Sequence, residues 1–265
     1  MTRVRLGLQD KFAPGASLAA KLANAQRFGF DALELSVDPI TAAAEAVRSH
    51  VPVSAICGGY RGWLIDPDAD SRRRAVEDLS QLADLAGELG CGCVVVPIWG
   101  RTRNLPNIGT GRTREEDERI FVDAMTRLAQ RAERAGSRLF IEPLNRYQND
   151  VCQTVAEALA LRDRIGSDAV FVMGDVFHMN IEESDLGAPL RAAGKWLGHV
   201  HLADNQRREP GTGHLDLRPV FAALAAIRYD GFASFELAAL SGQADEVLPR
   251  SVGYVRALMA EARIG

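Results

Sequence analysis

The chain lacks any long apolar segment. Its 265 residues contain no run of about 18 consecutive apolar residues, which is the shortest stretch typical of a helix that crosses a bilayer. The N-terminal segment MTRVRLGLQD also lacks the apolar core of a secretory signal peptide. We therefore expect no membrane partner and a cytoplasmic location.

Basic charge is not concentrated in any part of the sequence. The formal net charge is −4, and basic and acidic residues are mixed along the chain. A protein that binds nucleic acid normally presents a basic stripe or patch to the phosphates. We therefore expect no nucleic-acid partner.

Cysteine is scarce and poorly spaced for a metal site. Among Cys57, Cys91, Cys93 and Cys152, only the pair in CGC lies close together in the sequence. A thiolate zinc site normally needs a second such pair. We expect four reduced and mostly buried thiols.

The chain does contain a regular alternation of short apolar runs and amphipathic stretches. For the stretch 71–89, Ser71 is expected as the N-cap and Gly90 as the residue that ends the helix. The other expected helices include residues 16–28, 116–135, 154–165, 217–227 and 243–262. The expected strands are residues 4–9, 31–36, 51–57, 92–98, 138–144, 169–175, 197–204 and 232–237.

This alternation predicts an α/β fold built from parallel βαβ units. Eight such units in about 250 residues are typical of a closed (β/α)8 TIM barrel. In a doubly wound sheet, the first strand is normally followed by G-x-G-x-x-G, and the segment LGLQDKFAPG lacks that pattern. No linker divides the chain, so we expect residues 1–265 to form a single TIM-barrel catalytic domain.

Titratable residues end the last four expected strands. In such a barrel the chemistry lies at the carboxyl ends of the strands, and alternation of side chains lets all four point inward at one level. Three carboxylates together in a cavity would repel one another, so we expect a divalent cation among them. Oxygen-rich ligation with one imidazole suits Mn²⁺, Mg²⁺ or Co²⁺. The four residues are Glu142, Asp175, His201 and Glu236.

Each of the four also has a purely structural interpretation. Glu142 could pair with Arg146, and Asp175 could cap the helix that follows it. His201 could be a hydrogen-bonded core histidine, and Glu236 could face solvent. Four consecutive strands are unlikely to end this way by accident, so the metal site is the favoured hypothesis.

At these residues the chain resembles the xylose-isomerase-like TIM barrels, which include sugar isomerases, sugar epimerases and endonuclease IV. Within that superfamily the chain is most similar to the D-tagatose/D-psicose (ketose) 3-epimerases, over nearly its whole length. The motifs that carry the resemblance are EPLNR (142–146), DVFHMNIEE (175–183), HVHLADNQRREPGTGH (199–214) and YDGFASFE (229–236).

The resemblance implies both the ligands and the reaction. Glu142 and Glu236 would be the catalytic acid/base pair, and His178 and Arg207 would bind substrate. The cation, with Mn²⁺ favoured over Mg²⁺ or Co²⁺, would stabilise the cis-enediolate of an unphosphorylated keto sugar. One glutamate would remove a proton and the other would return it from the opposite face, which epimerises that carbon. The implied metal ligands are Glu142, Asp175, His201 and Glu236.

Three further residues are candidates for contacts with substrate. Ketose 3-epimerases have a glutamate six residues after the first ligand, where this chain has Gln148, so the identity of the sugar stays open. Trp63 and Trp99 lie in the long connections after the third and fourth strands and could stack on a sugar or pack on the rim. A sugar acid is an alternative substrate because Arg207 and Arg208 are adjacent and Arg101 and Arg103 lie in the connection after the fourth strand, although solvated loop arginines are the favoured interpretation. The resemblance also implies a homodimer or homotetramer.

Other activities share the expected fold. Endonuclease IV would need histidines after the third and fourth strands, where the chain reads AICGG and VVPIW. A lyase or dehydratase that acts on a keto-inositol or keto-glycoside would need the same ligands and differ only in the fate of the enediolate. Hydroxypyruvate isomerase fits the FHMN motif less well. A sugar-binding protein without catalysis would not need both Glu142 and Glu236.

Overall fold

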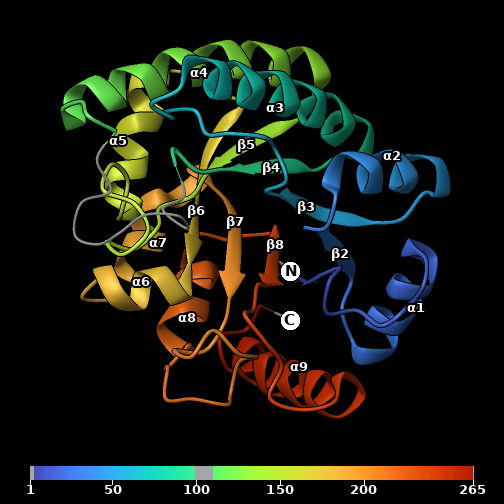
Figure 1. Cartoon of the computed structure of the whole chain (residues 1–265). Helices are drawn as coiled ribbons and strands as arrows, with labels where there is room; N and C mark the ends of the chain where they lie inside the picture. Colours follow the sequence, from blue (N-terminus) through green and yellow to red (C-terminus); the bar gives the residue numbers. More distant parts are fainter. Residues whose placement is uncertain (1–2, 99–109, 265) are drawn as a thin grey trace.

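A computed structural model describes residues 3–98 and 110–264, and the structural statements below refer to these residues. The candidate substrate residue Trp99 lies outside the described residues. Eight parallel strands form a closed barrel in the order β1 to β8, with helices around it (Figure 1). This confirms the predicted TIM-barrel architecture.

The strands and helices alternate along the chain as predicted. The strands are β1 (Arg5–Gln9), β2 (Ala32–Leu35), β3 (Val53–Cys57), β4 (Gly92–Val95), β5 (Arg138–Ile141), β6 (Val170–Asp175), β7 (Leu197–Leu202) and β8 (Phe232–Phe235). The helices are α1 (Leu18–Phe28), α2 (Pro39–Ser49), α3 (Ala69–Leu89), α4 (Arg114–Ala135), α5 (Val155–Ile165), α6 (Val176–Glu182), α7 (Ala188–Ala193), the 3₁₀ turn η1 (Gly194–Trp196), α8 (Arg218–Ala226) and α9 (Ala244–Glu261).

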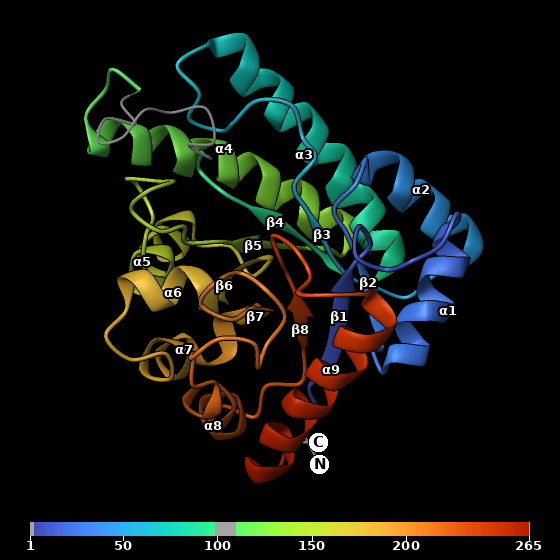
Figure 2. The ribbon, with the colours of Figure 1, turned by 60° about the horizontal axis from the view of Figure 1, so that its bottom comes forward.

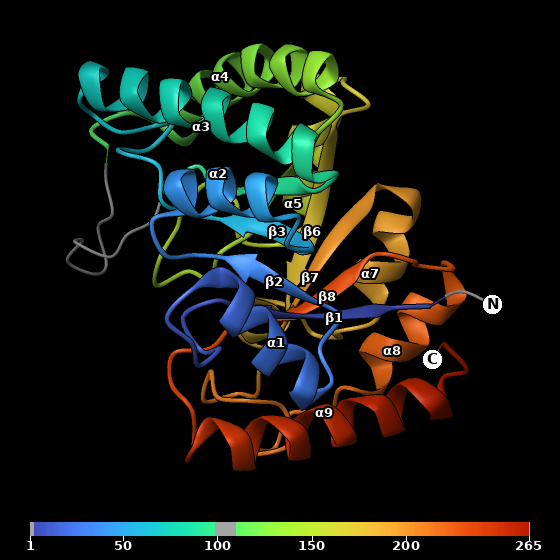
Figure 3. The ribbon, with the colours of Figure 1, turned by 90° about the vertical axis from the view of Figure 1, so that its right-hand side faces the viewer.

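The helices form a ring outside the barrel. Helices α3 and α4 run side by side (Figure 3) and pack over β4 and β5, and α9 packs between α8 and α1 (Figure 2). The two ends of the chain meet, since the backbone amide of Val4 donates to the carbonyl of Ile264 over 3.4 Å. None of the helices in the described ranges is long and apolar enough to cross a membrane.

The N-cap predicted for the helix over 71–89 is wrong. Helix α3 begins at Ala69, and its N-cap is Asp68, whose carboxylate accepts the backbone N–H groups of Asp70 and Ser71. Ser71 therefore lies inside the first turn, because the aspartate three residues earlier satisfies its amide first. Gly90 ends the helix with φ 67°, as predicted.

The interior of the barrel is tightly filled below the carboxyl ends of the strands. A cluster of Ala55, Val94, Phe140 and Met173 occupies part of this space. At Gly7 of β1, a Cβ atom would lie 2.3 Å from Ser234 Oγ and 2.7 Å from Ser54 Oγ, so only glycine fits there. This packed floor leaves the carboxyl ends of the strands as the place for a site.

Candidate functional site

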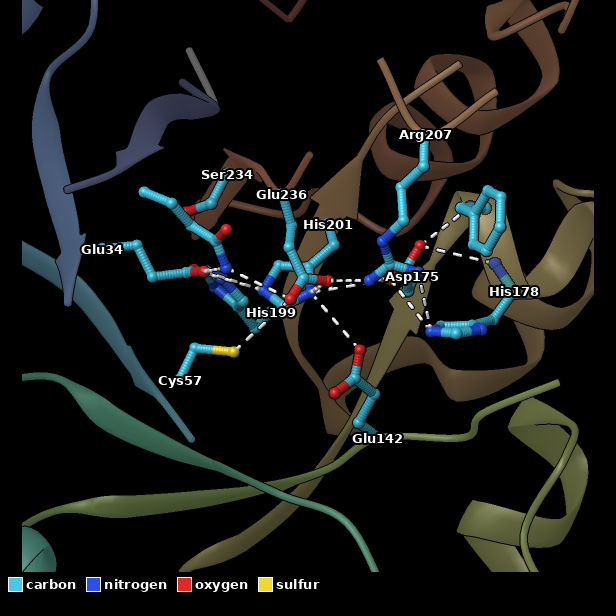
Figure 4. A network of polar contacts seen from close by, with 12 residues as sticks. Glu34, Cys57, Glu142, Asp175, His178, His199, His201, Arg207, Ser234 and Glu236 are labelled. Atoms are coloured by element: carbon cyan, nitrogen blue, oxygen red, sulfur yellow. Dashed lines mark hydrogen bonds and ion pairs between the residues drawn. The ribbon is translucent and has the colours of Figure 1, made fainter. Parts of the chain in front are cut away.

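The four titratable residues predicted at the ends of β5 to β8 lie together (Figure 4). Each offers one atom within 4.8 Å of the others, so the group could hold a metal ion. Strand register produces this convergence, because Asp175 on β6 pairs with His201 on β7, and His201 pairs with Ser234, two residues before Glu236. Glu142 follows β5 directly. The structure confirms the proximity, and the role of these residues as ligands stays a prediction.

The orientation of His201 suits a divalent cation. Its Nε2 lies 3.1 and 3.2 Å from the two oxygens of Glu34, while its Nδ1 lies 3.0 Å from Glu236 Oε2 and 3.4 Å from Glu142 Oε1. Nδ1 and Glu142 Oε1 are buried, and neither has a hydrogen-bond partner in the described part of the chain. A cation among these atoms would satisfy both of them and neutralise the carboxylates, so the donor set fits.

The two glutamates of the cluster have opposite acid–base character. Burial and the nearby Glu236 raise the pKa of Glu142 to about 7, although His201 opposes this. Burial also raises the pKa of Glu236, but Arg207 and His201 outweigh it and hold that pKa well below its usual value. Neighbouring carboxylates with pKa values pushed apart are typical of acid/base chemistry.

Asp175 caps the helix that follows it and also faces the cluster, while its role as a ligand stays a prediction. Its Oδ1 accepts the backbone N–H groups of Phe177 (2.8 Å) and His178 (3.4 Å), which caps the start of α6. Its Oδ2 lies 3.2 Å from a guanidinium nitrogen of Arg207 in the cluster. Because β6 leads into α6 without a loop, the capping interaction also fixes where His178 lies.

Arg207 reaches the cluster from the loop after β7. One of its nitrogens contacts both Glu236 Oε2, at 2.5 Å, and Asp175 Oδ2, and the guanidinium lies 4.6 Å from the ring centre of Phe177. The Arg207 backbone is left-handed, with φ 53°, and its carbonyl accepts the N–H of Ala238 over 2.7 Å. The loop therefore holds Arg207 in an uncommon conformation that aims it at the carboxylates.

Asp204 organises this loop, and the sequence did not lead us to predict this role. Its side chain is 1% exposed and accepts the backbone N–H groups of Asn205 (2.8 Å), Gly211 (3.0 Å) and Leu215 (3.1 Å). A Cβ atom at Gly213 would lie 2.3 Å from Asp204 Oδ1. The sequence does indicate this role, since ADN (203–205) is followed by GTG (211–213). An aspartate before a glycine-rich segment is typical of a carboxylate that accepts several backbone amides.

His178 is buried beside Arg207. Its Nδ1 accepts the backbone N–H of Asn145 over 3.2 Å, and its Nε2 lies 3.0 Å from Arg207 and 3.5 Å from Asp175 Oδ2. Burial lowers the pKa of His178 to about 4, so the ring is neutral near pH 7. The structure therefore places His178 at the cluster without making it one of the four converging groups.

Above the cluster lies a cavity of about 590 Å³. Gln148 and Trp63 both line it, as predicted, together with His178, Arg207 and the two glutamates. Trp63 also packs edge-on against Tyr60, with ring centroids 5.5 Å apart, so it packs on the rim, and stacking on a sugar stays a prediction. A cavity of this size, with several convergent polar groups, is typical of a small-molecule site.

Two buried residues on the far side of the cluster were not predicted. Glu34 at the end of β2 accepts from His199 Nε2 over 2.8 Å, and Gln9 Nε2 lies 3.1 Å from both Glu34 Oε1 and Glu236 Oε1. Burial raises the pKa of Glu34, but His201 and His199 outweigh it and lower the pKa to about 2. The one sequence feature that could have indicated Glu34 is a lone glutamate between two leucines in DALELS (31–36).

Replacing His178 with alanine is expected to raise KM by about tenfold or more, because the substrate loses a hydrogen bond in a buried site. Binding of Mn²⁺ should change by less than about threefold, because His178 is not one of the four converging groups. Steady-state kinetics and calorimetric titration with Mn²⁺ measure the two effects. A large loss of bound metal in this variant would show that His178 is a ligand.

Comparison with known proteins gives a consistent assignment. Residues 22–258 match the family described as xylose isomerase-like TIM barrel. The chain is 32% identical to 3-dehydro-D-guloside 4-epimerase of Escherichia coli over 88% of this chain and 92% of that protein. It is 34% identical to L-ribulose 3-epimerase of Mesorhizobium japonicum over 93% of this chain and 84% of that protein.

Solved structures give the same result. The apo crystal structure of 3-keto-D-glucoside 4-epimerase from E. coli is 31% identical in sequence and has a TM-score of 0.87, covering 96% of this chain and 100% of that one. A structure of L-ribulose 3-epimerase has a TM-score of 0.83 at 27% identity, with 98% and 96% coverage. The chain therefore belongs to the xylose isomerase-like TIM barrel family, and it is a carbohydrate isomerase or epimerase.

Proposed function

We propose that the protein is a metal-dependent epimerase of an unphosphorylated keto sugar, and that it inverts a carbon next to the ketone. The observation that carries this proposal is the placement of two carboxylates at one cavity. Glu142 and Glu236 come from β5 and β8, on separate sides of the barrel, and reach the cluster from opposite directions (Figure 4). Such a pair can remove a proton from one face of a carbon and return it to the other.

Each residue of the site has a separate role in the proposed reaction. One glutamate takes the proton from the carbon that bears a hydroxyl beside the ketone, and the other donates a proton to the same carbon from the opposite face. A bound divalent cation, which we propose is Mn²⁺, would stabilise the negative charge that develops on the substrate oxygens. Arg207 and His178 orient the substrate by hydrogen bonds to its oxygens, and Glu142, Asp175, His201 and Glu236 would hold the cation.

A glycoside that carries a ring ketone is the second candidate substrate. The E. coli relatives are named as 4-epimerases of a 3-dehydro-D-guloside and a 3-keto-D-glucoside, which place the inverted carbon beside a ring ketone. Gln148, which lines the cavity, replaces the glutamate that ketose 3-epimerases have at this position. The proton transfer is the same for a free ketose and a keto-glycoside, so both belong in the substrate panel. The dimer or tetramer and the cytoplasmic location stay predictions.

Hydrogen exchange with solvent tests the proposal. The protein is incubated with Mn²⁺ in D₂O and a panel of free 2-ketoses and 3-keto-glycosides, and products are followed by ¹H NMR. We expect deuterium at the inverted carbon and appearance of the epimer for at least one sugar. Loss of water with a new ultraviolet absorbance would instead support a lyase. Absence of exchange with every keto sugar would refute both activities.

A further inference from the structure

Glu34 is a fully buried carboxylate that the proposed reaction does not use. Its exposed fraction is 0%, and its neighbours in β2 are Leu33 and Leu35. Burial of a carboxylate lowers the free energy of unfolding by several kcal/mol unless hydrogen bonds satisfy it. In a purely structural role, an apolar side chain would therefore stabilise the fold better. Glu34 therefore requires an explanation in terms of its partners.

Both oxygens of Glu34 accept hydrogen bonds from residues of the site (Figure 4). Oε2 lies 2.8 Å from His199 Nε2 and 3.2 Å from His201 Nε2, and Oε1 lies 3.1 Å from His201 Nε2 and 3.1 Å from Gln9 Nε2. None of the interactions found in the described ranges pairs this carboxylate with a lysine or arginine. Its partners are the two imidazoles of β7 and one amide of β1.

These contacts place a hydrogen on Nε2 of His201. A carboxylate only accepts, so Nε2 must donate to Glu34, and with a cation bound in the cluster the neutral ring would then present the lone pair of Nδ1 to it. That lone pair points at Glu142, Asp175 and Glu236, with distances of 3.4, 3.8 and 3.0 Å to their nearest oxygens. A lone pair among carboxylates is favourable only with a cation between them.

The same carboxylate also reaches Glu236 through Gln9. Gln9 is 1% exposed, and its Nε2 lies 3.1 Å from an oxygen of each glutamate. A reversed amide would set an oxygen against two carboxylates, so the two N–H groups of Gln9 must face them. Gln9 thereby fixes the distance between Glu34 and Glu236.

We propose that Glu34 is a positioning residue for the metal centre, which holds His201 in the tautomer that presents Nδ1 to the cation and, through Gln9, holds Glu236 in place. His199 completes the arrangement by donating to Glu34 while its ring stacks on Phe140, with centroids 5.5 Å apart. The inference rests on the metal site of the proposed function and is independent of which sugar the protein uses.

Titration of metal-free protein with Mn²⁺ tests this role without any substrate. In Glu34→Gln, an amide N–H₂ group replaces one acceptor oxygen, and affinity for Mn²⁺ is expected to fall about 10- to 100-fold, as for other partners of metal-bound histidines. The matched control is Ser54→Ala, which removes a buried hydroxyl 3.0 Å from Ser234 Oγ and does not contact His201. This control should bind Mn²⁺ within about twofold of wild type, since its cost is limited to stability.

The possible outcomes separate the two proposals. Wild-type affinity in a folded Glu34→Gln protein overturns the role of Glu34 and leaves the epimerase proposal intact. Absence of divalent-ion binding by the wild type overturns both. If Glu34→Gln does not fold, NMR of ¹⁵N-histidine-labelled wild type loaded with diamagnetic Mg²⁺ decides the matter. We expect the hydrogen of His201 on Nε2, and a hydrogen on Nδ1 would overturn the proposal.

Discussion

Replacement of Glu236 with glutamine is expected to lower kcat by about 10²- to 10⁴-fold, the range for loss of a general acid or base. Glutamine has nearly the same size but cannot take up or release the proton. Glu236 lines the cavity and is held in place by Gln9, His201 and Arg207. Steady-state kinetics at saturating Mn²⁺ and exchange in D₂O measure the loss.

Glu246→Gln is the matched control for this substitution. Glu246 is exposed in the first turn of α9 and does not line the cavity, so the control should keep kcat within about twofold and stability within about 0.5 kcal/mol. Circular dichroism should show that Glu236→Gln is folded, because it removes one of several like charges from a buried cluster. A folded variant that keeps its full kcat would refute the acid/base role of Glu236.

Removal of divalent ions is expected to abolish turnover and to lower thermal stability. At a metal concentration 100 times its dissociation constant, binding to the native state contributes about 2.7 kcal/mol. For a chain of this size that corresponds to a rise in Tm of about 5–10 °C when metal is added back. Treatment with EDTA, elemental analysis, and assays with added Mn²⁺, Mg²⁺ or Co²⁺ measure the effects and rank the ions.

Two histidines provide the control for metal removal. His201→Gln should lose most of the metal-induced rise in Tm, because the imidazole lies in the cluster. His214→Gln should keep the full rise, since His214 is exposed in the loop after β7. Protein that elemental analysis shows to be free of metal, yet turns over at the full rate, would contradict the proposed cofactor.

Much of the fold and the cluster could be predicted because their signals are local in the sequence. In the sequence, a strand that is buried on both faces is a short apolar run, and a helix between two strands is an amphipathic stretch. A polar residue directly after such a run must lie at the carboxyl end of its strand. Glu142, Asp175, His201 and Glu236 satisfied that rule on successive strands, and the structure brings them within 4.8 Å.

The residues that were missed depend on contacts across the barrel. Glu34 and His201 are 167 positions apart in the chain, and Gln9 and Glu236 are 227 positions apart. Closure of β1 on β8 is what brings these pairs together. The residues next to a glutamate in an apolar strand do not indicate which distant imidazole it will contact. The sequence therefore placed Glu34 in a strand and did not predict its contact with His201.

The sequence by itself determined the alternating strands and helices, the family resemblance and the four groups that could hold a cation. Only the tertiary structure decided which nitrogen of His201 faces them, which single backbone conformation presents Arg207, and that Asp175 caps α6 with one oxygen while it faces the cluster with the other. The physical reason is that these properties are directions rather than identities. For His201 that direction is set only once barrel closure has brought its partners within about 3 Å, whereas Asp175 takes its direction from the amides of α6 that follow it.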